Sequence, residues 1–431
     1  MGYFKDTKTS TKDDIPVFNS SSDSKSEGFL NTVIKGLSWM GGLRGTTRAL
    51  AFIKILILAR ILSPSEFGLF GIAMLFLSLL EIISETGVNI FLIQEGDDIN
   101  SFIDTAWIVS IVRGILIASI LFLLSPAISR FFNSPQSLNV LLLISLAPLI
   151  RGFINPSIVK LQKNLLFAKE FVFRLVIYFL DAIIAISVAL VTHSAVSLVY
   201  GLLAGAVFEV CASHLFVRPG PKLRFVKNKL NLIIKRGKWV TFAGIFNYLF
   251  ENIDDAVVGR LLDTTYLGTY QMAYKVSSLP MTEVSDIIQK VTFPVYSKMA
   301  DNKERLKRAF IKSLLATSIV VLPIGLILFF FSQEVVLILL GPKWLSVVPV
   351  IKALSFFGVV RAITETTYPL FLSLKKQNYV SAITLFSILG LAITIFPLVK
   401  NFDIVGAGIS SLTGALFAIP ITVYLLNKVF K

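Results

Sequence analysis

Long, continuous apolar runs separated by short polar segments dominate the chain. Each run is about twenty residues long, which is enough to cross a hydrocarbon core of about 30 Å as a helix. Strands of a membrane barrel would instead alternate apolar and polar positions over about ten residues. The pattern predicts an all-α membrane protein with twelve transmembrane helices, at residues 36–60, 67–93, 103–124, 138–159, 171–191, 195–217, 239–259, 266–290, 309–331, 346–371, 378–398 and 404–427.

One short pattern occurs twice, 200 residues apart. It runs from Arg60 to Ala73 as R-I-L-S-P-S-E-F-G-L-F-G-I-A and from Arg260 to Ala273 as R-L-L-D-T-T-Y-L-G-T-Y-Q-M-A. In both copies an apolar run ends at Arg, turns, and resumes through Gly into another apolar run. The repeat predicts the same helical hairpin made twice, and therefore a protein built from two related halves.

Six predicted helices in each half give a parallel repeat. Two such halves are related by an axis along the membrane normal, as in transporters that rock two lobes about a central site. The predicted organisation is a disordered tail at 1–28, an N-terminal six-helix lobe at 29–217, a basic linker at 218–238 and a C-terminal six-helix lobe at 239–431. The tail is rich in Ser, Thr, Lys and Asp, and too few apolar residues remain to offset the entropy of ordering.

The composition agrees with a membrane protein. Of the 431 residues, 55% are hydrophobic and 16% are charged, and the mean hydropathy is +0.78. A soluble protein carries about a quarter charged residues. The single Cys211 excludes an intrachain disulfide, and His193 and His214 have no recognisable ligand spacing, so no metal site is predicted.

The net charge of +15 is distributed asymmetrically between the two sets of loops. One set holds many Lys and Arg residues, including those of the 218–238 linker, whereas the alternate set holds only isolated cations. By the positive-inside rule, this asymmetry places both termini and the linker in the cytoplasm. The excess charge is therefore explained by topology, and no nucleic-acid partner is predicted.

Several basic residues lie within predicted spans, where an ionisable group is costly unless it faces a cavity or a partner. Arginine suits phosphate because its planar fork donates two parallel hydrogen bonds. One interpretation is therefore a water-filled cationic cavity that binds an anionic substrate group. The alternative is that each cation pairs with an acidic residue and only fixes helix packing. The candidate substrate-binding residues are Arg44, Arg48, Arg113, Arg151, Lys275 and Arg361.

Three acidic residues of the seventh predicted span are candidates for a coupling-ion or proton site. Glu251, Asp254 and Asp255 lie close together, and neighbouring carboxylates repel each other when both are charged, which favours binding of a proton or Na⁺. The alternative is simple pairing with Lys275 or Arg260. No cofactor is predicted beyond such a coupling ion.

Several short motifs, in order along the chain, resemble one known family. They read A-R-I-L-S-P-S-E-F-G-L-F at 59–70, E-T-G-V-N at 85–89, N-I-D-D-A-V-V-G-R-L-L at 252–262, L-G-T-Y-Q-M-A-Y at 267–274, and Phe293-Pro294 after the eighth span. Over about residues 30–430 the chain resembles the polysaccharide transporter family of oligosaccharide flippases (Wzx-like). That family belongs to a superfamily that also contains multidrug and toxin exporters and the lipid II flippase.

The resemblance implies a two-lobed transporter without enzymatic activity in the bacterial cytoplasmic (inner) membrane. It would move an undecaprenyl-diphosphate-linked oligosaccharide from the inner to the outer leaflet by alternating access, alongside polysaccharide polymerase and export proteins. Cationic cavity residues would attract the diphosphate, and Arg44, Arg48 and Arg113 occupy places where such residues are expected.

Two other functions are weighed against the flippase. A proton- or sodium-coupled multidrug exporter would share the architecture but would favour an acidic chamber. A membrane enzyme acting on the same lipid carrier would need large outer loops with catalytic residues, and the predicted outer loops have about fifteen residues or fewer. The sequence predicts no oligomeric state.

Overall fold

The computed structural model describes residues 45–84, 99–164, 166–218, 220–224, 226, 245, 248–249 and 251–431. These residues are almost entirely helical and contain no strand. The predicted tail, most of the 218–238 linker and the first nine residues of the predicted 36–60 span lie outside them.

A first bundle is formed by the N-terminal half of the chain. Its elements are a helix at residues 45–61, α2 (Pro64–Ile83), α4 (Ile99–Phe131), α5 (Ser137–Ile144), α6 (Leu146–Arg151), η1 (Pro156–Ile158), α7 (Val159–Lys163), α8 (Phe167–Thr192) and α9 (Val196–Phe216).

A second bundle is formed by the C-terminal half. Its elements are a helix at residues 251–261, α11 (Thr264–Met299), α12 (Lys303–Phe330), α13 (Ser332–Leu339), η2 (Pro342–Val347), α14 (Val348–Glu365), α15 (Thr367–Ser373) and α16 (Gln377–Phe430).

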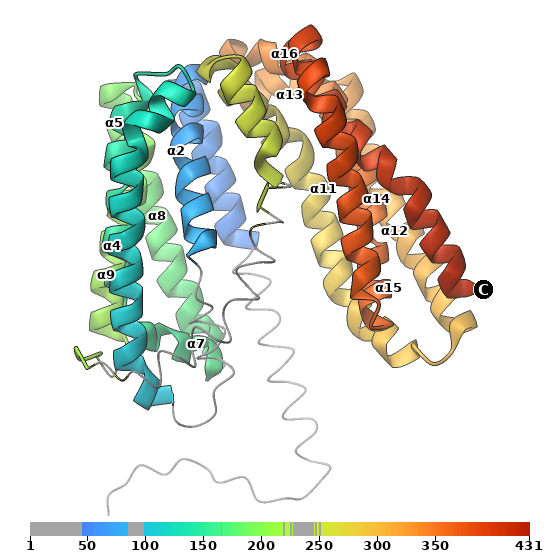
Figure 1. Ribbon diagram of the computed structural model, residues 1–431, viewed down its shortest axis with the longest axis horizontal. Helices are drawn as coiled ribbons and strands as arrows, with labels where there is room; N and C mark the ends of the chain where they lie inside the picture. The colour runs from blue at the N-terminus through green and yellow to red at the C-terminus, as the bar shows by residue number, and fades with distance from the viewer. Residues whose placement is uncertain are drawn as a thin grey trace, which may run out of the picture.

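The two bundles lean together at one end and diverge at the other (Figure 1). At the upper end in this view, residues 61–64 and 261–264 make the repeated turns, and we call this the hairpin end. The opposite end carries α7, the turn between α11 and α12, α15 and the C-terminus. We call it the basic end, because the turn between α11 and α12 is flanked by Lys298, Lys303 and Arg305.

Seven helices among the described residues are long and apolar enough to cross a membrane, so the chain is a multi-pass membrane protein. An eighth span is counted if the segments Ser137–Arg151 and Pro156–Lys163, which are bent by 70°, form one broken crossing. The structure therefore breaks the span predicted at 138–159 into two segments. Asn155 caps the new turn, accepting a hydrogen bond from the Ser157 amide at 2.9 Å, and Pro156 begins it.

The last two predicted spans are joined in α16. Its helical path is interrupted at Phe402 and at Asp403, whose φ of 49° is left-handed. α11, in contrast, is not among the seven apolar helices, although it is 36 residues long. It corresponds to the eighth predicted span, and it carries Lys275, Glu283, Asp286 and Lys290.

Both predicted hairpins are confirmed. A helix ends at residue 61 and α2 begins at Pro64; 200 residues later a helix ends at 261 and α11 begins at Thr264. The entry residues occupy the same repeat position. In the first copy Ser63 precedes Pro64, and proline suits the first helical turn because a backbone N–H there would have no partner within the helix. In the second copy the Asp263 carboxylate caps α11 by accepting a hydrogen bond from the Tyr266 amide at 2.9 Å.

The repeated glycines bring the two bundles into direct contact. A Cβ on Gly68 would overlap the carbonyl oxygen of Thr264, and one on Gly268 would overlap that of Pro64. The two contacts are the same contact with the copies exchanged, as expected where related surfaces meet across a two-fold axis. Only the absence of both side chains lets α2 and α11 cross backbone to backbone.

Trp344, in the turn η2 of the second bundle, also contacts the first bundle at the hairpin end, and we call this contact the clasp. The Trp344 indole N–H donates to the Ala59 carbonyl at 2.7 Å, and its fully buried ring packs edge-on against Phe67 at 5.4 Å. The Arg60 guanidinium reaches back to the Ile338 carbonyl. The hairpin end is thus closed by packing, hydrogen bonds and the glycine crossing.

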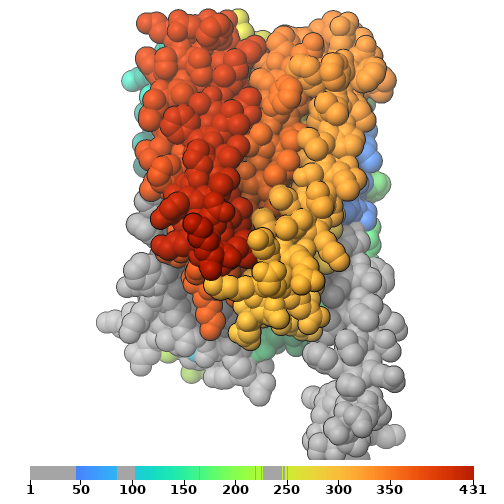
Figure 2. Space-filling view, turned by 90° about the vertical axis from the view of Figure 1, so that its right-hand side faces the viewer, coloured from blue at the N-terminus to red at the C-terminus, as the bar shows by residue number. Residues whose placement is uncertain are grey.

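The outward face of the second bundle is apolar. Figure 2 shows α12 and α16 side by side on this face. Both helices expose large hydrophobic side chains, among them Ile319, Leu326 and Phe330 of α12 and Ile393, Phe396 and Leu416 of α16. Such a surface suits contact with lipid chains, because each helix satisfies its own backbone hydrogen bonds.

Candidate functional site

A cavity of about 1130 Å³ lies between the two bundles. The first bundle contributes the helix at 45–61 and α2 to its wall. The second bundle contributes Tyr248, Glu251, Asn252, Asp254 and Asp255, together with side chains of α11, α14, α15 and α16. Gly71 and Gln271, which take the same position in the two repeats, lie on the wall just beyond the glycine crossing. The crossing therefore bounds the cavity toward the hairpin end.

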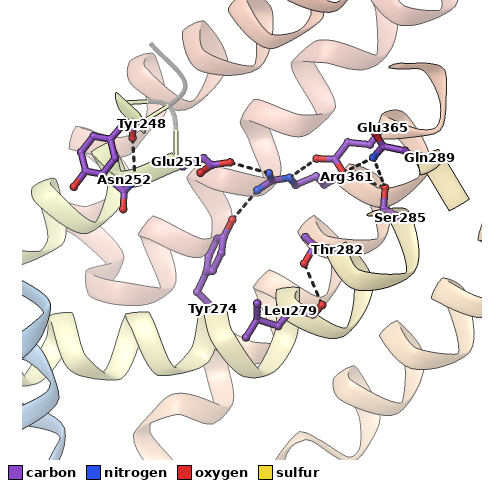
Figure 3. Close-up of polar contacts among 10 residues, drawn as sticks. All are labelled: Tyr248, Glu251, Asn252, Tyr274, Leu279, Thr282, Ser285, Gln289, Arg361 and Glu365. Atoms are coloured by element: carbon purple, nitrogen blue, oxygen red, sulfur yellow. Dashed lines mark hydrogen bonds and ion pairs between the residues drawn. The ribbon is translucent and has the colours of Figure 1, made fainter. Parts of the chain in front are cut away.

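Arg361 of α14 is the centre of a polar network on the second-bundle wall (Figure 3). Its guanidinium donates to Glu365 Oε1 at 2.7 Å and to the Tyr274 hydroxyl at 2.7 Å, and it lies 3.6 Å from Glu251 Oε1. Four-residue spacing puts Arg361 and Glu365 on one face of α14. The fork is thus held between two carboxylates from different helices, with a phenol on its third side.

The network continues from Glu365 into α11. The Ser285 hydroxyl donates to Glu365 Oε2 at 3.1 Å, and the Gln289 amide donates to Ser285 at 3.0 Å (Figure 3). Gln289, Glu365 and Arg361 all line the cavity. Neutral donors fix the carboxylate, which in turn orients the guanidinium, so the Arg361 head is positioned before any ligand arrives.

Asp254 and Asp255 point to different partners. Asp254 is buried, 4% exposed, and its Oδ2 accepts from the Tyr270 hydroxyl at 2.6 Å and from the Ser411 hydroxyl at 3.4 Å. Asp255 accepts from the Gln271 amide at 2.8 Å. Within the described part of the chain, no basic side chain lies within 4 Å of either carboxylate as an ion-pair partner. Both carboxylates accept hydrogen bonds from neutral donors, and a carboxylate in such surroundings can bind a proton or a small cation.

The remaining cations of the cavity wall lie on opposite bundles. Arg48, on the helix at 45–61, pairs with Glu283 and lies 3.6 Å from Asp286, both on α11. Lys275, also on α11, interacts electrostatically with Asp255. The structure thus gathers Arg48, Lys275 and Arg361 around one cavity with Glu251, Asp254 and Asp255.

Two predicted cavity cations lie elsewhere in the first bundle. Arg113 of α4 donates to the Ser84 hydroxyl at 3.1 Å and to the Glu81 carbonyl at 2.6 Å. Arg151 of α6 lies 3.8 Å from the Glu81 carboxylate and 4.0 Å from that of Glu209. Neither residue is on the described cavity wall: α4 packs against α2 on the side away from the second bundle (Figure 1), and α6 packs against α4 and α9. Arg44 lies outside the described residues.

The site also contains residues that were not assigned to it from the sequence. Glu283, Asp286 and Glu365 were recognisable as charges within predicted spans, but nothing in the sequence joined them to Arg48 or Arg361. Gln271 and Tyr274 belong to the L-G-T-Y-Q-M-A-Y motif at 267–274, but the motif assigned neither of them a role. Their roles follow only from the packing of α11 against α14 and α2.

The described cavity wall carries three cations and six carboxylates, so it is not cationic as a whole. The two bundles differ sharply. Among the described residues of the first-bundle wall, Arg48 is the one charged residue, and its neighbours on that wall include the apolar Phe52, Phe70 and Met74. All six carboxylates, with Lys275 and Arg361, come from the second bundle.

The chain is similar to a family of known proteins over most of its length. Residues 57–349 match the model of a family described as polysaccharide biosynthesis protein. It is 26% identical over 332 residues to the lipopolysaccharide biosynthesis protein WzxC of Escherichia coli, covering 77% of this chain and 68% of WzxC.

Solved structures show the same fold at low sequence identity. The lipid II flippase MurJ in an inward closed conformation superposes with a TM-score of 0.74 at 15% identity, covering 90% of this chain and 88% of that one. A multidrug resistance MATE family transporter in an inward-facing conformation gives a TM-score of 0.70 at 12% identity, covering 89% and 94%. These likenesses show the fold alone.

Proposed function

The chain belongs to the polysaccharide biosynthesis protein family, and on this premise we propose that it is a flippase for a lipid-linked oligosaccharide. It translocates an undecaprenyl-diphosphate-linked oligosaccharide from the inner to the outer leaflet of the bacterial cytoplasmic membrane for polysaccharide export. The observation that carries the proposal is the large cavity between the bundles, with Arg48 and Arg361 on opposite walls. No bond of the substrate is made or broken, so the protein is not an enzyme.

The proposed architecture is twelve transmembrane helices in two six-helix lobes related by an axis along the membrane normal. The reciprocal contacts of Gly68 and Gly268 support this symmetry. The abundance of Lys and Arg in one set of loops supports cytoplasmic termini, and hence a basic end that faces the cytoplasm.

The shape of the molecule supports the proposed alternating access. The bundles are tightly joined at the hairpin end and diverge at the basic end (Figure 1), so the head group of the substrate enters from the cytoplasmic leaflet. Arginine forks bind the diphosphate through parallel charge-assisted hydrogen bonds. The sugars occupy the cavity, and the polyprenyl chain stays among the lipid chains beside the apolar outer faces.

Glu251, Asp254 and Asp255 are the proposed coupling site, which takes up a proton or Na⁺. Glu251 contacts Arg361, and Asp254 contacts Tyr270 and Ser411, so these carboxylates join the helix at 251–261 to α11, α14 and α16. Ion uptake there changes contacts of four helices together, which links it to the arrangement of the second bundle. No cofactor takes part, and polymerase and export proteins act on the translocated product.

A coupled multidrug exporter is the second candidate, and the six carboxylates of the cavity are the observation in its favour. A chamber for cationic drugs would be acidic on both walls. Here the carboxylates belong to the second bundle, and Arg48 faces them from the first. The one-sided distribution fits an anionic head group bound between arginines better than a cationic drug.

The test is reconstitution of the full chain in liposomes with a fluorescent undecaprenyl-diphosphate oligosaccharide. Accessibility of the sugar to an added lectin reports translocation. Arg48→Ala should slow translocation at least about tenfold, because it removes charge-assisted hydrogen bonds worth about 1.5–3 kcal/mol. Arg174→Ala is the matched control, since Arg174 pairs with Glu170 within α8 and is not on the cavity wall.

Two outcomes contradict the proposal. Wild-type liposomes that leave the labelled lipid in its original leaflet would exclude the flippase activity. Efflux of ethidium with no translocation of the lipid would favour the multidrug exporter.

A further inference from the structure

Arg48 has two anionic partners within the chain itself. Its guanidinium pairs with Glu283 and lies 3.6 Å from Asp286, and all three side chains line the cavity. Glu283 and Asp286 are three residues apart, which places them on one face of α11. A guanidinium fork is therefore met by two separate negative groups, the same pattern of charge that a diphosphate offers.

These contacts bridge the two bundles. Arg48 belongs to the helix at 45–61 of the first bundle, and α11 belongs to the second. Among the described residues, every other ion pair joins groups within one bundle. The pair lies several helical turns from the glycine crossing, on the side of the cavity where the bundles diverge.

The side chains are only partly shielded from water. Their exposed fractions are 48% for Arg48, 35% for Glu283 and 42% for Asp286. Such a pair contributes little net free energy, and each partner is readily hydrated when separated. Asp286 also lies 3.9 Å from Lys290, so it retains a cation if Arg48 leaves.

We infer that Glu283 and Asp286 act as internal counter-ions that occupy Arg48 until a lipid diphosphate displaces them. This rests on the proposed function, because it takes Arg48 to bind the anionic head group. Displacement removes the one described ion bridge between the bundles at the moment the substrate binds. A neutral or singly charged lipid competes poorly with two carboxylates, so Glu283 and Asp286 also set selectivity for the diphosphate.

Competition with the substrate and a purely structural role predict opposite changes in anion binding when the charges of Glu283 and Asp286 are removed. If the carboxylates only hold Arg48 in place, removing their charge weakens binding of an anion. If they compete with the anion, removing their charge strengthens binding, and the gain requires Arg48.

The experiment measures binding of farnesyl diphosphate, a water-soluble lipid diphosphate, to the full chain in phosphatidylcholine nanodiscs. Glu283→Gln and Asp286→Asn should each bind it about two- to fivefold more tightly than wild type, which corresponds to the strength of a partly exposed ion pair. Neither change should have an effect in an Arg48→Ala background. Farnesol serves as the uncharged probe, and its binding should be the same in all variants.

Glu304→Gln is the matched control, because Glu304 lies exposed in the first turn of α12, away from the cavity wall. Equal or weaker binding of the diphosphate by both carboxylate variants, with Arg48→Ala also weaker, overturns the displacement and leaves the proposed function standing. Failure of wild type and every variant to bind the diphosphate contradicts the proposed function, and the inference with it.

Discussion

The two bundles begin with the same repeated hairpin but use their charges differently. Apart from Arg48, the ion-paired residues of the first bundle neutralise one another within that bundle. The Lys54 ammonium donates to Asp181 at 2.7 Å, and Arg151 lies between the carboxylates of Glu81 and Glu209. These pairs hold the helix at 45–61 to α8, and α6 to α2 and α9.

In the second bundle the charged groups face the cavity. Arg361 joins Glu365, Tyr274 and Glu251, while Asp254 and Asp255 rest on neutral donors. The repeated positions, such as Gly68 and Gly268, pack helices. The positions that carry the cavity chemistry have no counterpart in the other half. Duplication therefore preserved the crossing of the helices and left the charges free to diverge.

The largest effect is expected from adding a side chain at the glycine crossing, the feature that both halves share. Gly268→Ala should lower the stability of the detergent-solubilised protein by about 3 kcal/mol or more, because the new Cβ overlaps backbone rather than a movable side chain. Gly45→Ala is the matched control, since its Cβ meets nothing within 4 Å. Thermal unfolding followed by size-exclusion chromatography measures both. Equal melting temperatures would show that the crossing does not constrain the bundles.

The different use of charge in the two bundles can be tested by replacing one arginine in each. Arg361→Gln should reduce translocation of the labelled lipid at least about tenfold, since it removes the positioned fork and leaves Glu365 and Glu251 unpaired. Arg151→Gln removes a cation that the structure pairs away from the cavity, and its rate should stay within about twofold of wild type. The liposome assay gives both rates. Similar losses would mean that Arg151 also serves the substrate.

The smallest expected effect concerns the clasp at the hairpin end. Trp344→Phe removes the hydrogen bond to the Ala59 carbonyl and should cost about 1–2 kcal/mol. It should also raise the reactivity of a cysteine introduced at Phe70, on the cavity wall, toward a reagent added outside, in a Cys211→Ser background.

Trp107→Phe is the matched control for the clasp, because Trp107 donates to the Phe153 carbonyl at 3.2 Å within the first bundle. Its stability should fall similarly while the labelling of position 70 stays unchanged. Equal labelling in the two variants would contradict a clasp that closes the cavity.

Much of the fold could be predicted from the sequence because local patterns encode it. The continuous apolar runs predicted the helices, and the repeated Arg-to-Ala pattern predicted both hairpins. Their second helices, α2 and α11, begin at the same position of the repeat, Pro64 and Thr264. The broken helix around Asn155 was missed, because a capping hydrogen bond and a proline at 156 outweighed a continuous apolar run.

The candidate site was harder to predict. Charges within predicted spans were recognisable as costly residues, but no local pattern showed which of the six cations face the cavity, and Arg113, one of the three favoured by the family resemblance, is not on the described wall. Arg113 and Arg361 both lie in apolar helices; one faces α2 within its own bundle, and the other faces the cavity. Helical periodicity cannot distinguish these faces, since both are covered by protein.

The sequence by itself determined that the chain is a helical membrane protein with a duplicated hairpin and an asymmetric distribution of positive charge. These properties depend on hydrophobicity, turn residues and glycine, which act over a few neighbouring positions. Only the tertiary structure decided that Gly68 meets Gly268, that Arg48 meets Glu283 and Asp286, and that six carboxylates share one wall. The glycine and Arg48 contacts join segments 200 residues apart or more, and their geometry is set by how the two bundles pack against each other. The carboxylates come from different helices of the second bundle, so the packing of those helices decides that they share a wall.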